Sequence, residues 1–558
     1  MISQRSSPRQ STIAVALTSA AIVCTAGVMF GQQATQRAGN QRSGTPAAAG
    51  QPAAPNYAEQ KKVDPIVANG PIFVDWPKPD VALVFSGEQD GYLEPCGCAG
   101  LENQKGGLRR RATLLKQLRD QGWPVVALDS GGQEKRFGVQ PAIKAEFSLR
   151  AFAKMNYAAV GLGSDDLRMD LLSLVINLDS TANTLTSANA GIVDFDSGFT
   201  KRFRIVEAGG MKIGVTSVLG KQEVARFQNS SDLKLIDPEQ ALAQVLPEMK
   251  AAGCQQFVLL AHADPKEAGE LARRFPDFNW VVTAHGADEP PASPSKIEGT
   301  NAHLIEVGHK GMYVAVVGLY KQGAGSTGQG AGSKDVGDAK AVSLGSGLPA
   351  FRYQRVPLDH RFADAPEIDE MHVEYQKRLE TLGWEGLGLK PTPHPTGRKF
   401  AGSKVCADCH ISATDVYHKT PHYHGTETLV KLTPARQFDP ECVSCHATGW
   451  EPQKYYPFES GFLSIEKTPA MTGNGCENCH GPAARHVAAE TGELSASPAE
   501  TEQLRAALRL KIVENEGNKP GQAYGKVVEM CMTCHDLDNS PDFDFQKYWP
   551  EVKHVGKD

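Results

Sequence analysis

The sequence predicts two domains of different architecture, an α/β domain followed by a mainly α domain that is built around metal sites. Three observations carry this prediction. The chain has 558 residues, which exceeds the size of one ordinary domain. Apolar runs alternate with helical segments between residues 79 and 384. Eight of the 12 cysteines and ten of the 16 histidines lie after residue 393.

The composition is that of a globular protein, with 41% hydrophobic and 22% charged residues. A formal net charge of -6 gives no sign of the basic surface that a nucleic-acid-binding protein needs. We therefore expect no nucleic-acid partner.

Residues 1–31 are predicted to be an export signal or an N-terminal anchor. Arg5 and Arg9 precede an uncharged apolar stretch, Thr12 to Phe30. Because a membrane span needs about 20 apolar residues, a cleaved signal peptide and an uncleaved membrane anchor both stay open. Either alternative predicts a periplasmic or otherwise extracytoplasmic protein, and the second adds attachment to the membrane. Residues 32–78, rich in Gln, Ala, Gly and Pro, are expected to form a flexible linker.

The region 79–384 is predicted to be one α/β domain with a mixed sheet. The expected strands are Val81–Phe85, Val125–Leu128, Tyr157–Val160, Phe257–Leu260 and Trp280–Thr283. The expected helices are Gly107–Leu118, Ala142–Met155, Pro238–Lys250, Leu271–Phe275 and Ile368–Leu382. Residues 203–218 and 303–320 are expected to form hairpins that add antiparallel strands. Residues 385–399, with three prolines, separate this domain from the domain at 400–558.

Four Cys-x-x-Cys-His motifs dominate the C-terminal domain. Two thiols three residues apart can each form a thioether with one vinyl group of a heme, and the following His then coordinates the iron. Zinc sites and disulfides are the alternatives, but neither requires a His directly after each Cys pair. The sequence therefore predicts four covalently bound c-type hemes. The thioether cysteines are Cys406, Cys409, Cys442, Cys445, Cys476, Cys479, Cys531 and Cys534, and the proximal iron ligands are His410, His446, His480 and His535.

The sixth iron ligand in an electron carrier is usually a second His. Six further histidines are available, more than four hemes require, so some of them are bystanders. They are His394, His418, His422, His424, His486 and His554.

The C-terminal domain resembles the tetraheme cytochrome c-554 family. The resemblance is carried by Thr420-Pro421-His422, by Cys445-His446-Ala-Thr-Gly449, by the segment 474–482 with His486 after it, and by Phe545-x-x-Tyr-Trp-Pro550 before His554. It implies a mainly α, heme-packed fold. It also implies that His422, His486 and His554 are distal ligands, with His486 on the first heme, and that the heme on His446 is five-coordinate.

The region from Val81 to Leu382 resembles the calcineurin-like metallophosphoesterases of the 5′-nucleotidase type, which implies an α/β sandwich. The motifs are Gly106-Gly-Leu-Arg-Arg-Arg-Ala112, Leu128-Asp-Ser-Gly-Gly132, Gly210-Met-Lys-Ile-Gly214, Leu260-Ala-His262 and Ala284-His285-Gly286. Active members hold two metal ions, but no His precedes His262 here and the Gly-Asp position reads Gly131-Gly132. Hydrolysis by two metals is therefore expected to be lost.

A different metal site is the hypothesis that follows from the remaining ligands. Cys96 and Cys98 lie in the loop after the first strand, where the family's Asp-x-His would stand. Together with His262 and His285 they would offer a soft metal ion four ligands. Structural cysteines, a local disulfide or unmodified thiols are the alternatives.

Three functions follow from these patterns. The first is electron transfer between redox partner proteins through the hemes, with the α/β domain docking a partner or ligand. The second is an oxidoreductase that acts on a small nitrogen or oxygen compound at the open heme on His446. The third, a redox-coupled phosphoesterase, is disfavoured because the metal ligands are missing.

Overall fold

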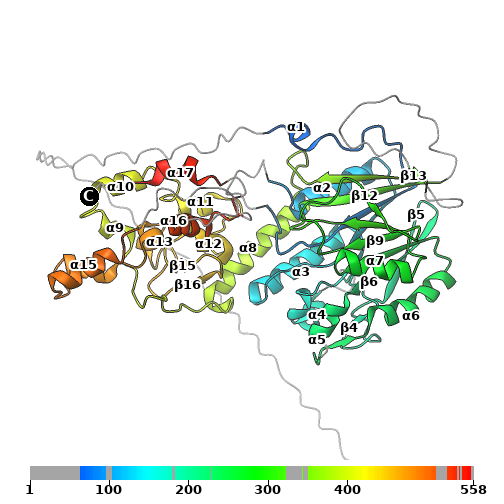
Figure 1. Cartoon of the computed structure of the whole chain (residues 1–558), viewed down its shortest axis with the longest axis horizontal. Helices are drawn as coiled ribbons and strands as arrows, with labels where there is room; N and C mark the ends of the chain where they lie inside the picture. Colours follow the sequence, from blue (N-terminus) through cyan, green and yellow to red (C-terminus); the bar gives the residue numbers. More distant parts are fainter. Residues whose placement is uncertain are drawn as a thin grey trace, which may run out of the picture. The chain divides into compact units, whose positions relative to one another are not determined.

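In the computed structural model, two six-stranded β-sheets pack against each other in the N-terminal part of the chain (Figure 1). The structure describes residues 63–95, 104–178, 183–227, 229–321, 342–343, 350–510, 525–536, 539–540 and 543–554. These ranges belong to one compact unit, Ala54–Asp558. The predicted export segment, most of the predicted linker, and both Cys96 and Cys98 lie outside the described residues.

The first sheet has the strand order β13-β14-β12-β1-β2-β3. Strands β1, β2 and β3 are parallel, whereas β12 runs antiparallel to both β1 and β14. The bounds are β1 Val81–Ser86, β2 Val125–Asp129, β3 Tyr157–Val160, β12 Tyr313–Tyr320, β13 Val342–Ser343 and β14 Ala350–Pro357.

The second sheet has the order β10-β11-β9-β8-β6-β5, and the strands β6, β8, β9 and β11 are parallel. Its bounds are β5 Phe203–Ala208, β6 Met211–Leu219, β8 Gln256–His262, β9 Trp280–Thr283, β10 Ser295–Lys296 and β11 His303–Glu306. A separate small pair consists of β4 Ala190–Ile192 and β7 Leu233–Leu235.

Helices cover the outer face of each sheet, so the layers are helix, sheet, sheet, helix (Figure 1). The alternation along β1 explains this arrangement, since successive side chains of a strand point to opposite faces. Leu83 and Phe85 pack against the second sheet, whereas Val84 packs against the helices. The helices are α1 Pro65–Asn69, α2 Leu108–Asp120, α3 Val139–Lys154, α4 Leu171–Asn177, α5 Lys221–Phe227, α6 Pro238–Ala251, α7 Pro265–Arg274 and α8 Pro366–Gly386, with one 3₁₀ turn at Asp166–Arg168.

The predicted α/β sandwich is confirmed, but the hairpin predicted at 303–320 is wrong. Its two strands, β11 and β12, belong to different sheets: β11 pairs with β9, and β12 pairs with β1. The turn between them contains Lys310 and Gly311, both at positive φ, and carries the chain from one sheet to the other. The other predicted hairpin, at 203–218, is the antiparallel pair of β5 and β6.

The part after residue 400 consists of short helices with a small apolar core. One cluster of eight buried apolar residues, among them Val443, Trp450 and Phe462, is the core cluster of this part among the described residues. Its elements are α9 Ser403–Cys406, α10 Ile411–Tyr417, α11 Gly425–Lys431, α12 Pro440–His446, β15 Trp450–Glu451, β16 Tyr456–Pro457, a 3₁₀ turn Pro469–Met471, α13 Cys476–His480, α14 Ala484–Glu490, α15 Pro498–Ala506, α16 Lys526–Met532 and α17 Phe545–Val552.

Helix α8 joins the two parts of the chain. Leu379 packs into the core of the α/β part, whereas Trp384 near the helix end packs on Trp450, with ring centroids 5.0 Å apart. The Trp384 indole N–H donates to the Leu463 carbonyl at 2.6 Å. Within the described ranges, no helix is both long enough and apolar enough to span a membrane.

Candidate functional site

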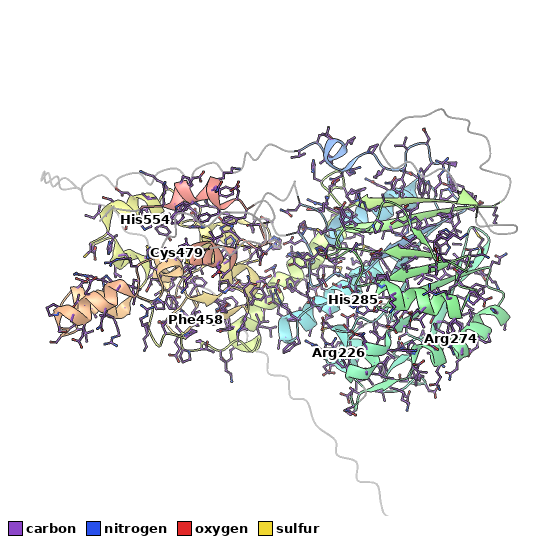
Figure 2. All side chains as sticks on the ribbon, in the orientation of Figure 1. Arg226, Arg274, His285, Phe458, Cys479 and His554 are labelled. Carbon is purple, nitrogen blue, oxygen red and sulfur yellow. The ribbon has the colours of Figure 1, made fainter. Side chains whose placement is uncertain are left out.

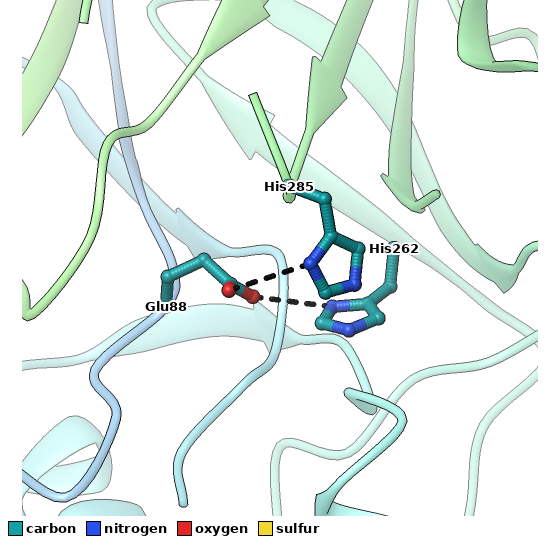
Figure 3. A group of neighbouring side chains, drawn as sticks. All are labelled: Glu88, His262 and His285. Atoms are coloured by element: carbon teal, nitrogen blue, oxygen red, sulfur yellow. Dashed lines mark ion pairs between the residues drawn. The ribbon is translucent and has the colours of Figure 1, made fainter. Parts of the chain in front are cut away.

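The carboxyl ends of β1, β8 and β9 bring Glu88, His262 and His285 together, and we call these three residues the α/β cluster (Figure 3). The carboxyl ends of parallel strands are where α/β sheets usually carry their sites. Glu88 Oε1 lies 3.5 Å from His262 Nδ1, and Glu88 Oε2 lies 3.8 Å from His285 Nδ1. The donor atoms of the three residues lie within 4.8 Å of one another, which is a spacing that one metal ion can bridge.

Two polar atoms of this cluster are buried without a hydrogen-bond partner, namely Glu88 Oε1 and His262 Nδ1. Buried polar atoms are nearly always satisfied, so these two atoms, 3.5 Å apart, make the cluster a candidate cation site. Burial and the neighbouring His285 lower the pKa of His262 to about 3, so its imidazole is neutral and can act as a ligand. A hydrogen bond to the Ser130 backbone orients the ring, as metal-ligating histidines commonly require.

Neighbouring carboxylates are already engaged in fixing the surrounding loops. Asp166 accepts backbone N–H bonds from Gly132, Gln133, Glu134 and Gly163 at 2.7–3.1 Å. Burial, followed by the charges of Asp90, Asp166 and Asp129, raises the pKa of Glu88 well above its usual range. Glu88 Oε1 and Glu134 Oε1 are both buried without a hydrogen-bond partner, and Glu88 is the acid whose oxygen atoms lie beside His262 and His285.

Gly132 shows why the aspartate of the phosphoesterase Gly-Asp motif has no room here. Its φ is +81°, and a Cβ added to it would collide with Glu88 Oε1. Glu88 therefore occupies the space that an aspartate at residue 132 would need. The sequence reasoning missed Glu88 because it searched the loop after the first strand for histidine and cysteine. The available signal was an acid two residues beyond that strand.

The structure brings His262 and His285 together as predicted, with ring centroids 4.5 Å apart. Cys96 and Cys98, the other two residues of that hypothesis, lie outside the described residues.

Short helices carry the Cys-x-x-Cys-His motifs of the C-terminal part. Helix α12 contains the whole second motif and α13 the whole third, whereas α9 ends at Cys406 and α16 contains Cys531. Residues three apart lie on one face of a helix, so each helical pair of thiols can reach the same heme. Sγ atoms of Cys406 and Cys476 interact, which places the first and third motifs side by side.

The Nδ1 atom of three proximal histidines is engaged by a neighbouring oxygen. His446 Nδ1 pairs with the Gly425 carbonyl at 2.9 Å, and His480 Nδ1 with the Leu508 carbonyl at 2.8 Å. His535 Nδ1 pairs with Ser540 Oγ at 3.0 Å. These contacts leave Nε2 as the nitrogen that can bind a metal, and they fix the orientation of the ring.

Two of the predicted distal histidines face proximal histidines. The rings of His422 and His535 have centroids 6.0 Å apart, and those of His554 and His480 are 5.8 Å apart. Two imidazoles that bind one metal ion from opposite sides, with bonds of about 2 Å, have centroids roughly 6 Å apart. Figure 2 labels Cys479, which belongs to the third motif, and the predicted distal residue His554.

The third predicted distal residue, His486, lies within electrostatic range of His410 of the first motif. Its Nδ1 faces Glu490 Oε1 at 3.5 Å, which suits a ring whose other nitrogen binds a metal. By contrast, the other spare histidines face no proximal histidine in the described ring contacts: His418 and His424 pack on Tyr423, and His394 packs on Phe400 and Phe458. His394 pairs with Thr396 Oγ1 at 2.8 Å.

This donor set fits c-type heme: each motif has two thiols and a proximal imidazole, three of these imidazoles have Nδ1 engaged and Nε2 available, and two face an opposing ring at the required spacing. The small apolar core fits as well, because porphyrins can fill the volume that side chains fill elsewhere.

Comparisons with known proteins found similarity to two kinds of protein. Residues 405–481, which include the first three motifs, match the family model described as cytochrome c554 and c-prime. Cytochrome c-554 from Nitrosomonas europaea is 34% identical over 96 residues, covering 15% of this chain and 38% of that protein.

A snake venom 5′-nucleotidase from Crotalus adamanteus is 24% identical over 236 residues, covering 40% of this chain and 40% of that protein. The chain thus spans about two fifths of the length of these curated relatives. A solved 5′-nucleotidase precursor from Thermus thermophilus superposes with a TM-score of 0.42 at 16% identity, over 54% of this chain and 59% of that one. Residues 405–481 of the C-terminal part thus match the cytochrome c554 and c-prime family model, and the chain also shows similarity to 5′-nucleotidases.

Proposed function

We propose that this protein transfers electrons between redox partner proteins through four c-type hemes bound to its C-terminal domain. The observation that carries the proposal is the pairing of motif histidines with opposing histidines, His535 with His422 and His480 with His554. When bound, the hemes supply reversible one-electron chemistry at iron. The chain's own residues hold each iron in a fixed, partly buried place, which sets its reduction potential.

In this proposal His410 and His486 would hold the iron of the first heme, His480 and His554 that of the third, and His535 and His422 that of the fourth. The heme of the second motif is held by His446. The resemblance to the cytochrome c-554 family makes this second heme the one with an exchangeable sixth position.

The order of the motifs in space supports a chain of electron transfer. The Cys406 and Cys476 thiols interact, so the first and third hemes would lie side by side. His446 lies within electrostatic range of His422 and His535, which relates the second heme to the fourth. Electrons would therefore pass within two neighbouring pairs of hemes before reaching a partner.

Export is part of this proposal. Residues 1–31 would direct the chain across the cytoplasmic membrane or anchor it there, and residues 32–78 would connect this segment to the α/β domain at 79–384. The heme domain would follow at 400–558. A protein so placed would exchange electrons in the periplasm or an equivalent compartment.

The test is heme stoichiometry combined with a redox titration of the full-length holoprotein. Four hemes per chain and four reversible one-electron steps are expected. Substituting both cysteines of one motif by alanine should remove one heme and one step. Fewer than four covalently attached hemes in the intact protein would overturn the proposal.

A second candidate function concerns the α/β cluster, which would bind one divalent metal ion without hydrolysing phosphoesters. The unpartnered buried atoms of Glu88 and His262 support binding, and the lack of room at Gly132 speaks against the two-metal arrangement. Cys96 and Cys98 stay predicted as further ligands. Metal analysis should find one non-heme metal ion per chain, and the metal content should be lower in Glu88→Gln. The metal content of the double variant Cys96→Ser and Cys98→Ser decides whether the thiols contribute. Metal-dependent nucleotide hydrolysis by the full chain would contradict this function.

A further inference from the structure

Lys144 of helix α3 connects the α/β cluster's loop to the helix that carries the second heme motif. Its Nζ donates to the Gly91 carbonyl at 3.0 Å and to Glu441 Oε2 at 2.5 Å. Lys144 is buried, and Glu441 stands directly before Cys442 in the first turn of α12. The charges of Glu441 and Glu134 outweigh the effect of burial and raise the pKa of Lys144, so the amine is charged.

Further contacts fix α12 to the α/β domain. Asp439 caps the helix by accepting from the Glu441 N–H at 3.1 Å. The same carboxylate accepts from Gln140 Nε2 at 2.9 Å and from Gln376 Nε2 at 3.1 Å, and both amides belong to the α/β part. Since the second heme is attached to α12, the α/β domain would hold that heme rigidly.

The other end of this connection is equally well fixed. Gly91 lies three residues after Glu88, and the loop between them is held by backbone bonds to the 131–133 turn. Glu88 N–H donates to the Gly131 carbonyl at 2.9 Å, and Gly91 N–H donates to the Gln133 carbonyl at 2.8 Å. The path from the cluster to Cys442 therefore runs along the loop from Glu88 to Gly91 and through the two hydrogen bonds that the Lys144 ammonium group donates. It then follows the Glu441 side chain and the peptide bond to Cys442.

We propose that the metal ion at Glu88, His262 and His285 is a redox-active one, of the iron(II) class, and that it exchanges one electron with the heme of the second motif along Gly91, Lys144 and Glu441. This inference rests on the metal-binding role proposed above. Two imidazoles and one carboxylate with open positions are a donor set typical of non-heme iron(II). The same set also suits zinc, so the connection to a heme is what favours a redox metal.

The electron balance needs no further reactant. A metal ion held by Glu88, His262 and His285 would give up one electron, from +2 to +3, and the heme held by His446 would take it up, from +3 to +2. No atom and no proton is transferred. The reverse step returns the electron to the cluster metal when the reduction potential of the heme lies below that of the cluster metal.

The experiment uses the full-length holoprotein with oxidised hemes under anaerobic conditions. One equivalent of Fe²⁺ is added, or Zn²⁺ in a parallel sample, and the absorbance of reduced c-type heme is followed after rapid mixing. The iron sample should show up to one reduced heme and a ferric signal in electron paramagnetic resonance, whereas the zinc sample should show neither. The Glu88→Gln variant measures any direct reduction by unbound Fe²⁺.

Lys144→Met should slow this heme reduction by about tenfold at an unchanged iron content. Lys154→Met is the matched control, because Lys154 is an exposed lysine in the last turn of the same helix, α3. If Lys144→Met does not fold, as judged by its heme content, the double variant with Glu441→Gln removes both charges together and takes its place.

The outcomes separate the two proposals. Iron bound at one equivalent with no heme reduction, or an unchanged rate when Lys144 is replaced, overturns the electron exchange and leaves the metal site standing. Binding of zinc but not iron also overturns it. If neither metal binds, the metal-binding role fails and the inference fails with it, while the count of four hemes is unaffected.

Discussion

His422 and His535 face each other across 6.0 Å between ring centroids, although 113 residues of chain separate them. Burial, followed by His535 and His446, lowers the pKa of His422 to about 4, so its imidazole is neutral at physiological pH. A neutral ring facing another ring at this distance is what an iron with two imidazole ligands requires.

The first prediction follows from this pair. Replacing His422 by alanine should leave the fourth heme attached through Cys531 and Cys534 but remove one axial ligand. The absorption spectrum should then show one high-spin heme, and that heme should bind carbon monoxide. His424→Ala is the matched control, because the His424 ring packs on Tyr423 and faces no proximal histidine in the described ring contacts, and it should leave the spectrum unchanged. Equal spectra for the two variants would show that His422 is not a ligand.

A second prediction concerns the heme on His446. The resemblance to the cytochrome c-554 family implies an exchangeable sixth position, and the three predicted distal histidines lie near the other three motifs. The reduced wild-type protein should therefore bind carbon monoxide at about one heme in four. Binding would favour the alternative function, an oxidoreductase for a small nitrogen compound. If none of the four hemes binds carbon monoxide, electron transfer alone remains the proposed function.

The sequence alone could predict most of the α/β layers, because strands such as β1 and β8 are unbroken apolar runs that are buried on both faces. It failed at 303–320, since two apolar strands joined by a glycine-containing turn look alike whether they pair with each other or enter different sheets. Pairing across sheets is a tertiary choice that local pattern does not encode.

The sites divide in the same way. The heme motifs could be recognised in the sequence because their chemistry fixes the spacing of Cys and His along the chain. Only the two histidines of the α/β cluster could be predicted from the sequence. Glu88 joins His262 and His285 through the positions of β1, β8 and β9 in the fold and not through sequence proximity. Lys144 and Glu441 lie 297 positions apart in the sequence, so no local pattern can predict their contact.

The third prediction tests the space around Gly132. Gly132→Ala should destabilise the folded protein by about 1–3 kcal/mol, from the positive φ and from the clash with Glu88 Oε1. It should also weaken metal binding at the cluster. Gly299→Ala is the control, because Gly299 has a φ of +78° but nothing within 4 Å of an added Cβ. Thermal unfolding and metal content measure the two effects, and a Gly299 variant that behaves like the Gly132 variant would leave only backbone strain as the cause.

The fourth prediction is a pH dependence of stability from His372 on α8. Burial, followed by Arg109, lowers its pKa to about 3, whereas the unfolded chain has a value near 6.5. Because the unfolded state binds the proton more strongly, the contribution of His372 is complete above pH 6.5 and declines as the pH falls toward 3. The loss should reach roughly 2 kcal/mol near pH 5.

The comparison that isolates this effect is with His372→Gln, which cannot take up a proton. Urea unfolding of both proteins at pH 7.5 and pH 5 should show a smaller loss of stability in the variant. Identical losses would mean that His372 is not held neutral in the folded protein. Other buried groups titrate equally in both proteins, so they cancel in the difference.

The fifth prediction concerns Asp439, which joins the second heme motif to the α/β domain. Asp439→Ala removes the N-cap of α12 and takes one acceptor from each of the buried amides of Gln140 and Gln376, of which Gln140 still donates to Tyr375 Oη at 3.0 Å. The cost should be about 2–4 kcal/mol, more than that of an N-cap alone. Asp237→Ala is the control, since Asp237 caps α6 at an exposed position and touches no second element through its cap contacts. It should cost about 1 kcal/mol. The reduction potential of the second heme should shift only when Asp439 is replaced, because only that change frees the helix on which the heme is held. A potential that stays fixed while stability falls would show that α12 keeps its place without the α/β domain.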